Sequence, residues 1–157
     1  MIQRIQTLYL AIGAIALSVA YFLPLLTFID NNQIYLEVYI KGLVDSSSPS
    51  LGISENILIG LQIVVIAVIV MSVLCIFLYK NRKSQLKLVR FLVGLLLVAI
   101  ALVFFQLGSA ITKATGIEAD FNHPAVYLML VSLVMYVLAF RGIRKDEALV
   151  RAADRLR

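Results

Sequence analysis

Four runs of apolar residues, each free of charged side chains, leave few folds open to this chain. The runs cover residues 8–29, 57–79, 91–111 and 125–140. About 20 apolar residues in a helix cross a hydrocarbon core of about 30 Å, and the fourth run reaches this length if its flanks are helical. Hydrophobic residues make up 62% of the chain and charged residues only 15%, which departs strongly from the balance of water-soluble domains. The runs therefore predict an integral membrane protein with four spans.

The first run has some features of a secretory signal, because Arg4 precedes it and small residues occur at positions 18–20. The apolar residues continue well past Ala20, however, where a cleaved signal would turn polar. We therefore expect an uncleaved first span whose outer end is bent by Pro24.

The basic residues are divided unequally between the two sides of the predicted spans. Of the 14 lysines and arginines, only Lys41 and Lys113 lie in the connections at residues 30–56 and 112–124. The others lie near the N-terminus, in the 80–90 connection or in the tail. The positive-inside rule then predicts that both termini and the 80–90 connection are cytoplasmic.

The outer connections contain signals for local structure. The sequence IYLEVYI is rich in β-branched and aromatic residues and predicts a short strand or hairpin on the outer face. Ser54 is expected to cap the second helix. Gly116 is expected to end the third helix, and Asn122 or His123 is expected to cap the fourth.

Together these signals predict one domain, residues 1–157, with an all-α membrane fold. We expect an up-down four-helix transmembrane bundle with a short β-like outer loop and a cytoplasmic C-terminal helix at about 141–157.

Few residues could carry chemistry. His123, the single histidine, lies near Glu118 and Asp120, but this short cluster matches no known metal-ligand spacing. Capping and solvation explain it better than a metal does. The serines of the spans have no histidine or carboxylate at membrane depth to activate them; they are Ser18, Ser72, Ser109 and Ser132. Cys75 is the single cysteine and cannot form an intrachain disulfide. We therefore expect no enzyme activity, cofactor or metal, and no nucleic-acid binding, because aromatic residues do not interleave with the basic ones.

One polar pair stands out within the spans. Gln62 and Gln106 each lie five residues inside the outer end of their run, so antiparallel helices would bring them to the same depth. An amide in lipid seeks a partner, and we expect an interhelical hydrogen bond between them. The alternative is that they line a small polar ligand cavity. In the first span, Ala11, Ala14 and Ser18 form a small-residue stripe suited to close helix packing.

The tail, residues 141–157, has the pattern of an amphipathic helix. Its acidic residues come early and its basic residues late, as the helix dipole prefers, and Glu147 and Arg151 have the favourable i,i+4 order. The residues expected to form a docking surface are Glu147, Leu149, Arg151, Asp154 and Leu156. A mixed-charge amphipathic helix more often packs on protein than on lipid. The expected partner is the N-terminal segment with the 80–90 connection, or another subunit.

Both ends of the chain carry a resemblance. The opening MIQRIQTLYL and the closing IRKDEALVRAADRLR resemble the terminal signatures of a Bacteroidota family of small four-span inner-membrane proteins, domain of unknown function 4293. The plan of four spans, a longer first outer loop and a charged tail is similar over essentially the whole chain. The resemblance implies a multi-pass protein of the bacterial inner membrane. It implies no activity, substrate or catalytic residue.

These features favour a non-enzymatic accessory or scaffold subunit of a membrane assembly, with the tail and the 80–90 connection as its docking face. The expected partners are the lipid bilayer and other membrane-protein subunits or further copies of the chain. The alternative is a small transporter or channel component that acts as an oligomer around Gln62 and Gln106. Absence of charge in the spans favours the first hypothesis.

Overall fold

Three helical segments are long and apolar enough to cross a membrane. In the computed structural model, which describes residues 2–30, 33–45, 55–78 and 81–155, these segments are Ile57–Phe77, Ser84–Lys113 and Pro124–Val150. A shorter apolar segment is Ile5–Ala20. Large apolar side chains such as those of Ile15, Ile63 and Phe105 point outward along the helices. So much exposed apolar surface is typical of contact with lipid, and the mostly helical structure is compatible with an all-α membrane protein.

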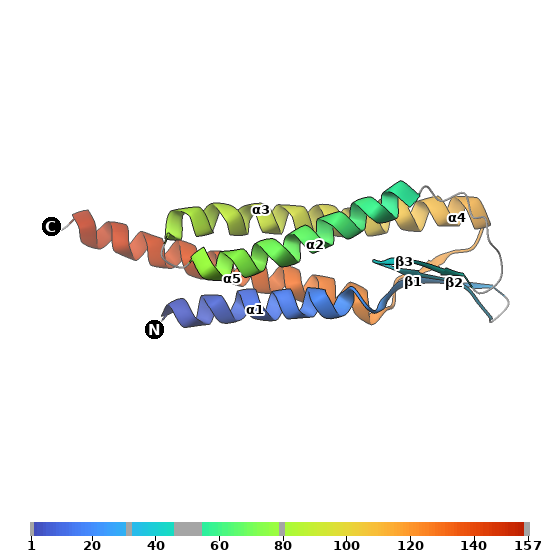
Figure 1. Ribbon diagram of the computed structural model, residues 1–157, viewed down its shortest axis with the longest axis horizontal. Helices are drawn as coiled ribbons and strands as arrows, with labels where there is room; N and C mark the ends of the chain where they lie inside the picture. Colours follow the sequence, from blue (N-terminus) through green and yellow to red (C-terminus); the bar gives the residue numbers. More distant parts are fainter. Residues whose placement is uncertain (1, 31–32, 46–54, 79–80, 156–157) are drawn as a thin grey trace.

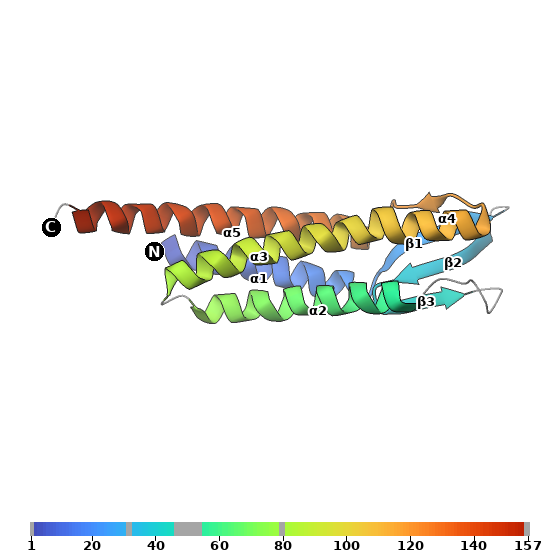
Figure 2. The ribbon, with the colours of Figure 1, turned by 90° about the horizontal axis from the view of Figure 1, so that it is seen from above.

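The helices run alternately in opposite directions and pack side by side (Figures 1 and 2). They are α1 (Ile2–Ala20), α2 (Glu55–Phe77), α3 (Arg82–Ala101), the π-helix η2 (Leu102–Gly108), α4 (Ser109–Thr115) and α5 (Pro124–Arg155). One end of the bundle holds both chain termini, and we call it the terminal end. The opposite end holds the β-strands, and we call it the sheet end.

The first apolar run is not one helix, which corrects the predicted helical span at residues 8–29. Helix α1 ends at Ala20, residues 21–23 form a turn, and strand β1 (Pro24–Asp30) follows. Proline has no N–H for a helical hydrogen bond and disfavours helical backbone in the residue before it. The residues that follow then pair with a neighbouring strand, so the run divides at Pro24.

The sheet confirms the predicted strand in the outer connection and enlarges it. Its order is β3-β2-β1-β4, with β2 (Gln33–Tyr39), β3 (Gly42–Asp45) and β4 (Ala119–Asp120). All its pairings are antiparallel. Leu36, Val38 and Ile40 are buried while Glu37 and Tyr39 between them are partly exposed, which is the period of two that a one-sided sheet requires.

The predicted 80–90 connection is mostly helix, because α3 begins at Arg82. The Asn81 side chain accepts a hydrogen bond from the Ser84 backbone N–H, so Asn81 is the N-cap. From Arg82 the helical path continues through η2 and α4 to Thr115, a length of roughly 50 Å. Gly116 ends it with φ 74°, the left-handed conformation that glycine adopts easily, as predicted.

Helix α5 joins the predicted fourth span and the predicted tail helix into one. It has 32 residues without a break, roughly 48 Å. Its C-terminal end extends beyond the ends of α1 and α3 (Figures 1 and 2).

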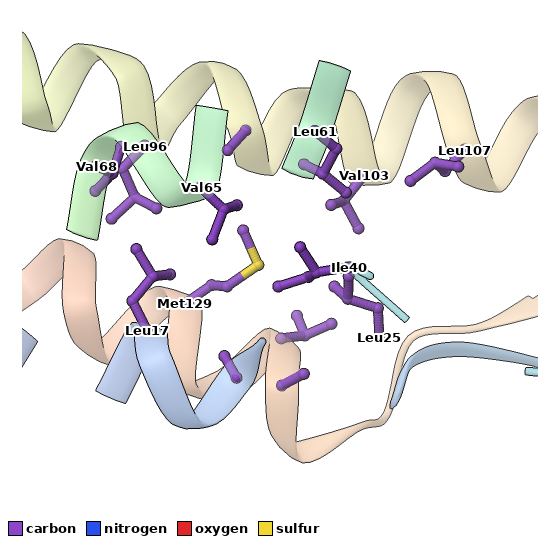
Figure 3. Packing of buried hydrophobic residues seen from close by; sticks show 14 of the residues in the cluster. Leu17, Leu25, Ile40, Leu61, Val65, Val68, Leu96, Val103, Leu107 and Met129 are labelled. Carbon is purple, nitrogen blue, oxygen red and sulfur yellow. The ribbon is translucent and has the colours of Figure 1, made fainter. Parts of the chain in front are cut away.

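One apolar core joins the helices to the sheet. In the middle of the bundle, Leu17, Val65 and Leu96 meet from three helices. Nearer the sheet end, Leu25 and Ile40 lie beside Val103 (Figure 3). The sheet therefore covers the sheet end of the bundle with apolar side chains, and its position is fixed by that packing.

Candidate docking face and polar contacts

The tail and the N-terminal helix are joined by a buried hydrogen bond. The Gln6 Nε2 donates to Asp146 Oδ2 at 2.6 Å, and both side chains are buried. Gly142, one turn earlier on α5, makes room for this contact, since a Cβ there would lie 3.0 Å from Gln6 Cγ. The first turn of the tail is thus fixed to α1, in agreement with the N-terminal segment as one of the two expected partners.

Beyond this contact the α5 side chains divide between two faces. Glu147 is buried, 9% exposed, and borders a hollow of about 220 Å³ together with Leu86 and Arg144. Leu149 is 55% exposed and Val150 43% exposed. We call the surface formed by Leu149 and Val150 the tail patch.

The structure places only some of the predicted docking residues. Glu147 points into the protein and Leu149 away from it. Arg151 and Asp154 lie in the α5 backbone, but their side chains, like Leu156 as a whole, lie outside the described residues. The predicted Glu147–Arg151 pair is therefore untested.

The end of α2 and the start of α3 are joined by the buried side-chain amide of Gln85. The Gln85 Nε2 donates to the Cys75 backbone oxygen at 3.1 Å. Sequence reasoning missed Gln85 because it lies among charged residues that were assigned to a solvated connection. The signal that could have identified it is its position: Val89, Leu92 and Leu96 follow it at helical spacing and are all buried.

Gln62 does not form the predicted pair with Gln106. The Gln62 Nε2 donates to the Tyr21 hydroxyl at 2.7 Å, while the Gln106 side chain is exposed on η2. The unwinding of the first run places Tyr21 just after α1 and within reach of α2, so it supplies the partner. The polar pair is therefore Gln62 with Tyr21, and it joins α1 to α2.

Helices α1 and α5 approach each other closely at Gly13. A Cβ at Gly13 would lie 2.6 Å from Cε1 of Tyr136, whose side chain is fully buried. The Ser132 hydroxyl donates to the Gly13 backbone oxygen at 3.0 Å. The predicted stripe of small residues places Ala14 in the core, but it is Gly13 that allows the approach.

The serines of the spans use their hydroxyls in the helices themselves. The Ser18 hydroxyl donates to the Ala14 oxygen, the Ser72 hydroxyl to the Ile69 oxygen and the Ser132 hydroxyl also to the Leu128 oxygen. The Ser109 hydroxyl donates to the Phe105 oxygen in the same way. Such bonds satisfy a hydroxyl in an apolar surrounding.

At the sheet end, His123 joins α5 to the sheet. Its Nε2 lies 2.9 Å from Thr27 Oγ1 of β1 in a hydrogen bond. Pro124 is the first residue of α5, as predicted, and the His123 backbone oxygen accepts from the Val126 N–H. The His123 ring therefore binds the sheet instead of capping the helix. In the described part of the chain, no three His, Cys, Asp or Glu side chains come together as a metal site.

Nearby, η2 borders a shallow hollow of about 410 Å³. The Phe104 ring stacks on the Phe121 ring with centroids 4.7 Å apart. Gly108 lies against Phe121, because a Cβ at that position would be 2.7 Å from its Cζ. The wide turn of η2 thus accommodates the aromatic ring that follows β4.

One phenol at the sheet surface interacts with an acidic neighbour. The Tyr39 hydroxyl donates to Glu37 Oε2 at 2.8 Å. This hydrogen bond to the carboxylate, together with burial and the charge of Glu37, raises the pKa of Tyr39 above its usual value.

The comparisons with known proteins agree with the resemblance of the two chain ends. The comparison with curated proteins gave no match. One family, described as "Domain of unknown function (DUF4293)", matches residues 2–156. Because this match covers nearly every residue, the chain belongs to the DUF4293 family.

Proposed function

We propose that the protein crosses the bacterial inner membrane four times, with both termini in the cytoplasm and the sheet outside. Helix α1, at roughly 28 Å, is long enough to be the fourth span beside the three longer ones. Its outward face is apolar, with Ile5, Leu8, Ile12 and Ile15 exposed. The basic side of the chain coincides with the terminal end. The elements of the sheet end hold the other two lysines, Lys41 between β2 and β3 and Lys113 in α4. This distribution supports the orientation by the positive-inside rule.

We propose further that the protein is a non-enzymatic accessory or scaffold subunit of a membrane assembly. The observation that carries this proposal is the projection of α5 beyond the bundle (Figure 1). The tail patch lies on that projecting part, where the surrounding residues are largely charged. Two neighbouring apolar side chains held on a firmly anchored helix fit the apolar groove of a partner subunit.

A small transporter or channel component is the alternative. A transport pathway of this kind would need Gln62 and Gln106 to face a common polar space. The Gln62 amide instead donates a hydrogen bond to Tyr21 of the same chain. This contact favours packing as the role of Gln62 and so supports the scaffold proposal.

The topology is tested by cysteine labelling from outside the cell in a Cys75→Ala background. A cysteine at position 48 should react with a membrane-impermeant reagent, and one at position 84 should react only after the membrane is opened. The reverse pattern would overturn the proposed orientation.

The docking role is tested by changing the tail patch alone. The double variant Leu149→Gln, Val150→Gln should insert and melt like the unchanged protein, because both side chains are exposed, but should lose the subunit that copurifies in mild detergent. The matched control is Asp146→Asn, which alters the internal contact with Gln6 and leaves the tail patch intact. Retention of the same copurifying proteins by the double variant would refute the proposal.

A further inference from the structure

A groove lies along one face of α3, and it is separate from the helix contacts described above. It has a volume of about 580 Å³ and is lined by Lys87, Arg90, Phe91, Gly94, Leu95 and Val98. They occupy positions 87, 90 and 91, 94 and 95, and 98, so each group follows the previous one by three or four positions and together they form one stripe along the helix. The groove runs from a basic end near the start of α3 to an apolar end in the middle of the span.

The groove exists because Gly94 has no side chain. A Cβ built at this position meets no atom within 4 Å, so the space beside it is open. Phe91 and Val98, both more than half exposed, stand one turn to either side. In water such a notch would be a poorly covered apolar surface, whereas in a bilayer an acyl chain can fill it.

The basic end has charge available for a ligand. Lys87 and Arg90 are both exposed, and neither forms an ion pair with another described residue. The Arg90 guanidinium lies 5.7 Å from the centroid of the Phe140 ring of α5, a cation–π distance. This contact holds the guanidinium over the ring, and the five N–H donors of a guanidinium still allow it to bind an anion.

The order of charge and apolar surface matches one class of molecule. Lys87 and Arg90 precede the apolar run that begins at Phe91, which places them at headgroup level if α3 crosses the bilayer as proposed above. We propose that the groove binds an anionic phospholipid of the leaflet at the terminal end. Lys87 and Arg90 bind the phosphate, and one acyl chain lies over Gly94 between Phe91 and Val98.

The distance along the helix suits this arrangement. From Arg90 to Val98 the α-helix rises by roughly 12 Å, which is most of the depth of one leaflet in a core of about 30 Å. Basic residues near the membrane surface are attracted to anionic lipid headgroups. We therefore expect Lys87 and Arg90 together to favour an anionic over a zwitterionic lipid by about 10- to 30-fold.

The test uses the full chain, delipidated in detergent and then supplied with phosphatidylglycerol or phosphatidylcholine. Native mass spectrometry should show one retained phosphatidylglycerol at a concentration at which phosphatidylcholine is not retained. The variant Lys87→Gln, Arg90→Gln should lose this preference, while the control Lys113→Gln, at the sheet end of the same helical path, should keep it. Equal retention of phosphatidylglycerol by the double variant would overturn the assignment of the headgroup site.

A second pair of variants tests the groove itself. Gly94→Leu should fill the notch and lower phosphatidylglycerol retention by at least several fold. Gly60→Leu is the matched control, because a Cβ at Gly60 of α2 also meets no atom within 4 Å, and it should have no effect. If Gly94→Leu retains the lipid unchanged, or if inorganic phosphate competes as well as the lipid does, the groove is not a lipid site. If native mass spectra show a dimer that Gly94→Leu dissociates, the occupant is a second copy and the proposal fails.

These outcomes are separable from those of the docking proposal. Loss of lipid preference in the Lys87→Gln, Arg90→Gln variant, with its copurifying subunit retained, supports the lipid site independently of the tail patch. If position 84 is labelled from outside, it is the topology that fails.

Discussion

Replacing Gly13 by alanine should destabilise the bundle although alanine is the better helix former. The new Cβ would lie 2.6 Å from Cε1 of Tyr136 and 3.0 Å from two further ring atoms. Since the Tyr136 ring is fully buried between helices, it cannot turn away without displacing α5. Overpacking of this kind costs about 1–3 kcal/mol.

Part of this cost is offset within the helix. Alanine is more favourable than glycine in a helix by about 0.5–1 kcal/mol. The net loss expected for Gly13→Ala is therefore up to about 2.5 kcal/mol, and the loss relative to an open glycine site changed in the same way is about 1–3 kcal/mol. Gly60→Ala is the control, because its Cβ meets no atom within 4 Å, and only the gain in helix propensity should appear.

The measurement is thermal or denaturant unfolding in the same detergent for both variants. The expected result is a lower midpoint for Gly13→Ala and an equal or higher midpoint for Gly60→Ala. Tyr136→Leu should reduce the penalty of Gly13→Ala in a double-mutant cycle, because it removes the ring that the new methyl group meets. Equal midpoints for the two alanine variants, or strict additivity in the cycle, would refute the close packing of α1 on α5.

Three further changes have definite expected results. Gln62→Leu and Tyr21→Phe should each lower stability in detergent by about 0.6–2 kcal/mol, and the double variant should cost little more than either, as unfolding midpoints will show. Asp146→Ala should lower the free energy of unfolding by about 1–3 kcal/mol, because it leaves a buried amide donor without its acceptor. An unfolding midpoint equal to that of the unchanged protein would contradict the buried bond. The Tyr39 phenol should ionise above its usual pKa of 10.0, so its bond to Glu37 stabilises the fold at lower pH and is lost as pH rises through the raised value. Glu37→Gln should lower that pKa in a difference absorbance titration against Tyr39→Phe, and an unchanged titration would count against the contact.

The sequence predicted correctly those elements that depend only on residues close together in the chain. The second apolar run, expected to be helical at residues 57–79, forms α2 at Glu55–Phe77. An uninterrupted apolar run in lipid favours a helix, because a helix satisfies the backbone hydrogen bonds within the segment. The stop at Gly116 and the start at Pro124 were also correct, since each follows from the backbone preference of one residue.

The errors occurred where a partner distant in sequence decides the outcome. Residues 24–30 are apolar enough for a helix, yet they pair with strands on either side, and hydropathy alone cannot distinguish the two. The partner of Gln62 was wrong for the same reason, because Tyr21 becomes available only when α1 ends early. Gln6 and Asp146 lie 140 positions apart, and no periodicity in either segment indicates that they meet.

The order of the tail has a different cause from the one that its own sequence suggests. An isolated helix of about a dozen residues is marginal in water, so an ordered tail would by itself imply a packing surface. In this protein the tail continues α5, whose first turns are held by the bundle. The costly nucleation step is therefore already complete, and each further residue needs only the smaller propagation term.

Continuity alone accounts for helical order up to Arg155, and order is no evidence for a partner. The proposal of a partner rests instead on the arrangement of the side chains. Asp146 and Glu147 are buried on the inner side, and Asp146 anchors the tail through its hydrogen bond to Gln6. Leu149 and Val150 are largely exposed, near the end of α5 that extends beyond α1 and α3 (Figure 1). A tail that served only to hold the topology would need basic residues and no exposed apolar pair, so the tail patch is the part of this helix whose presence a docking function explains.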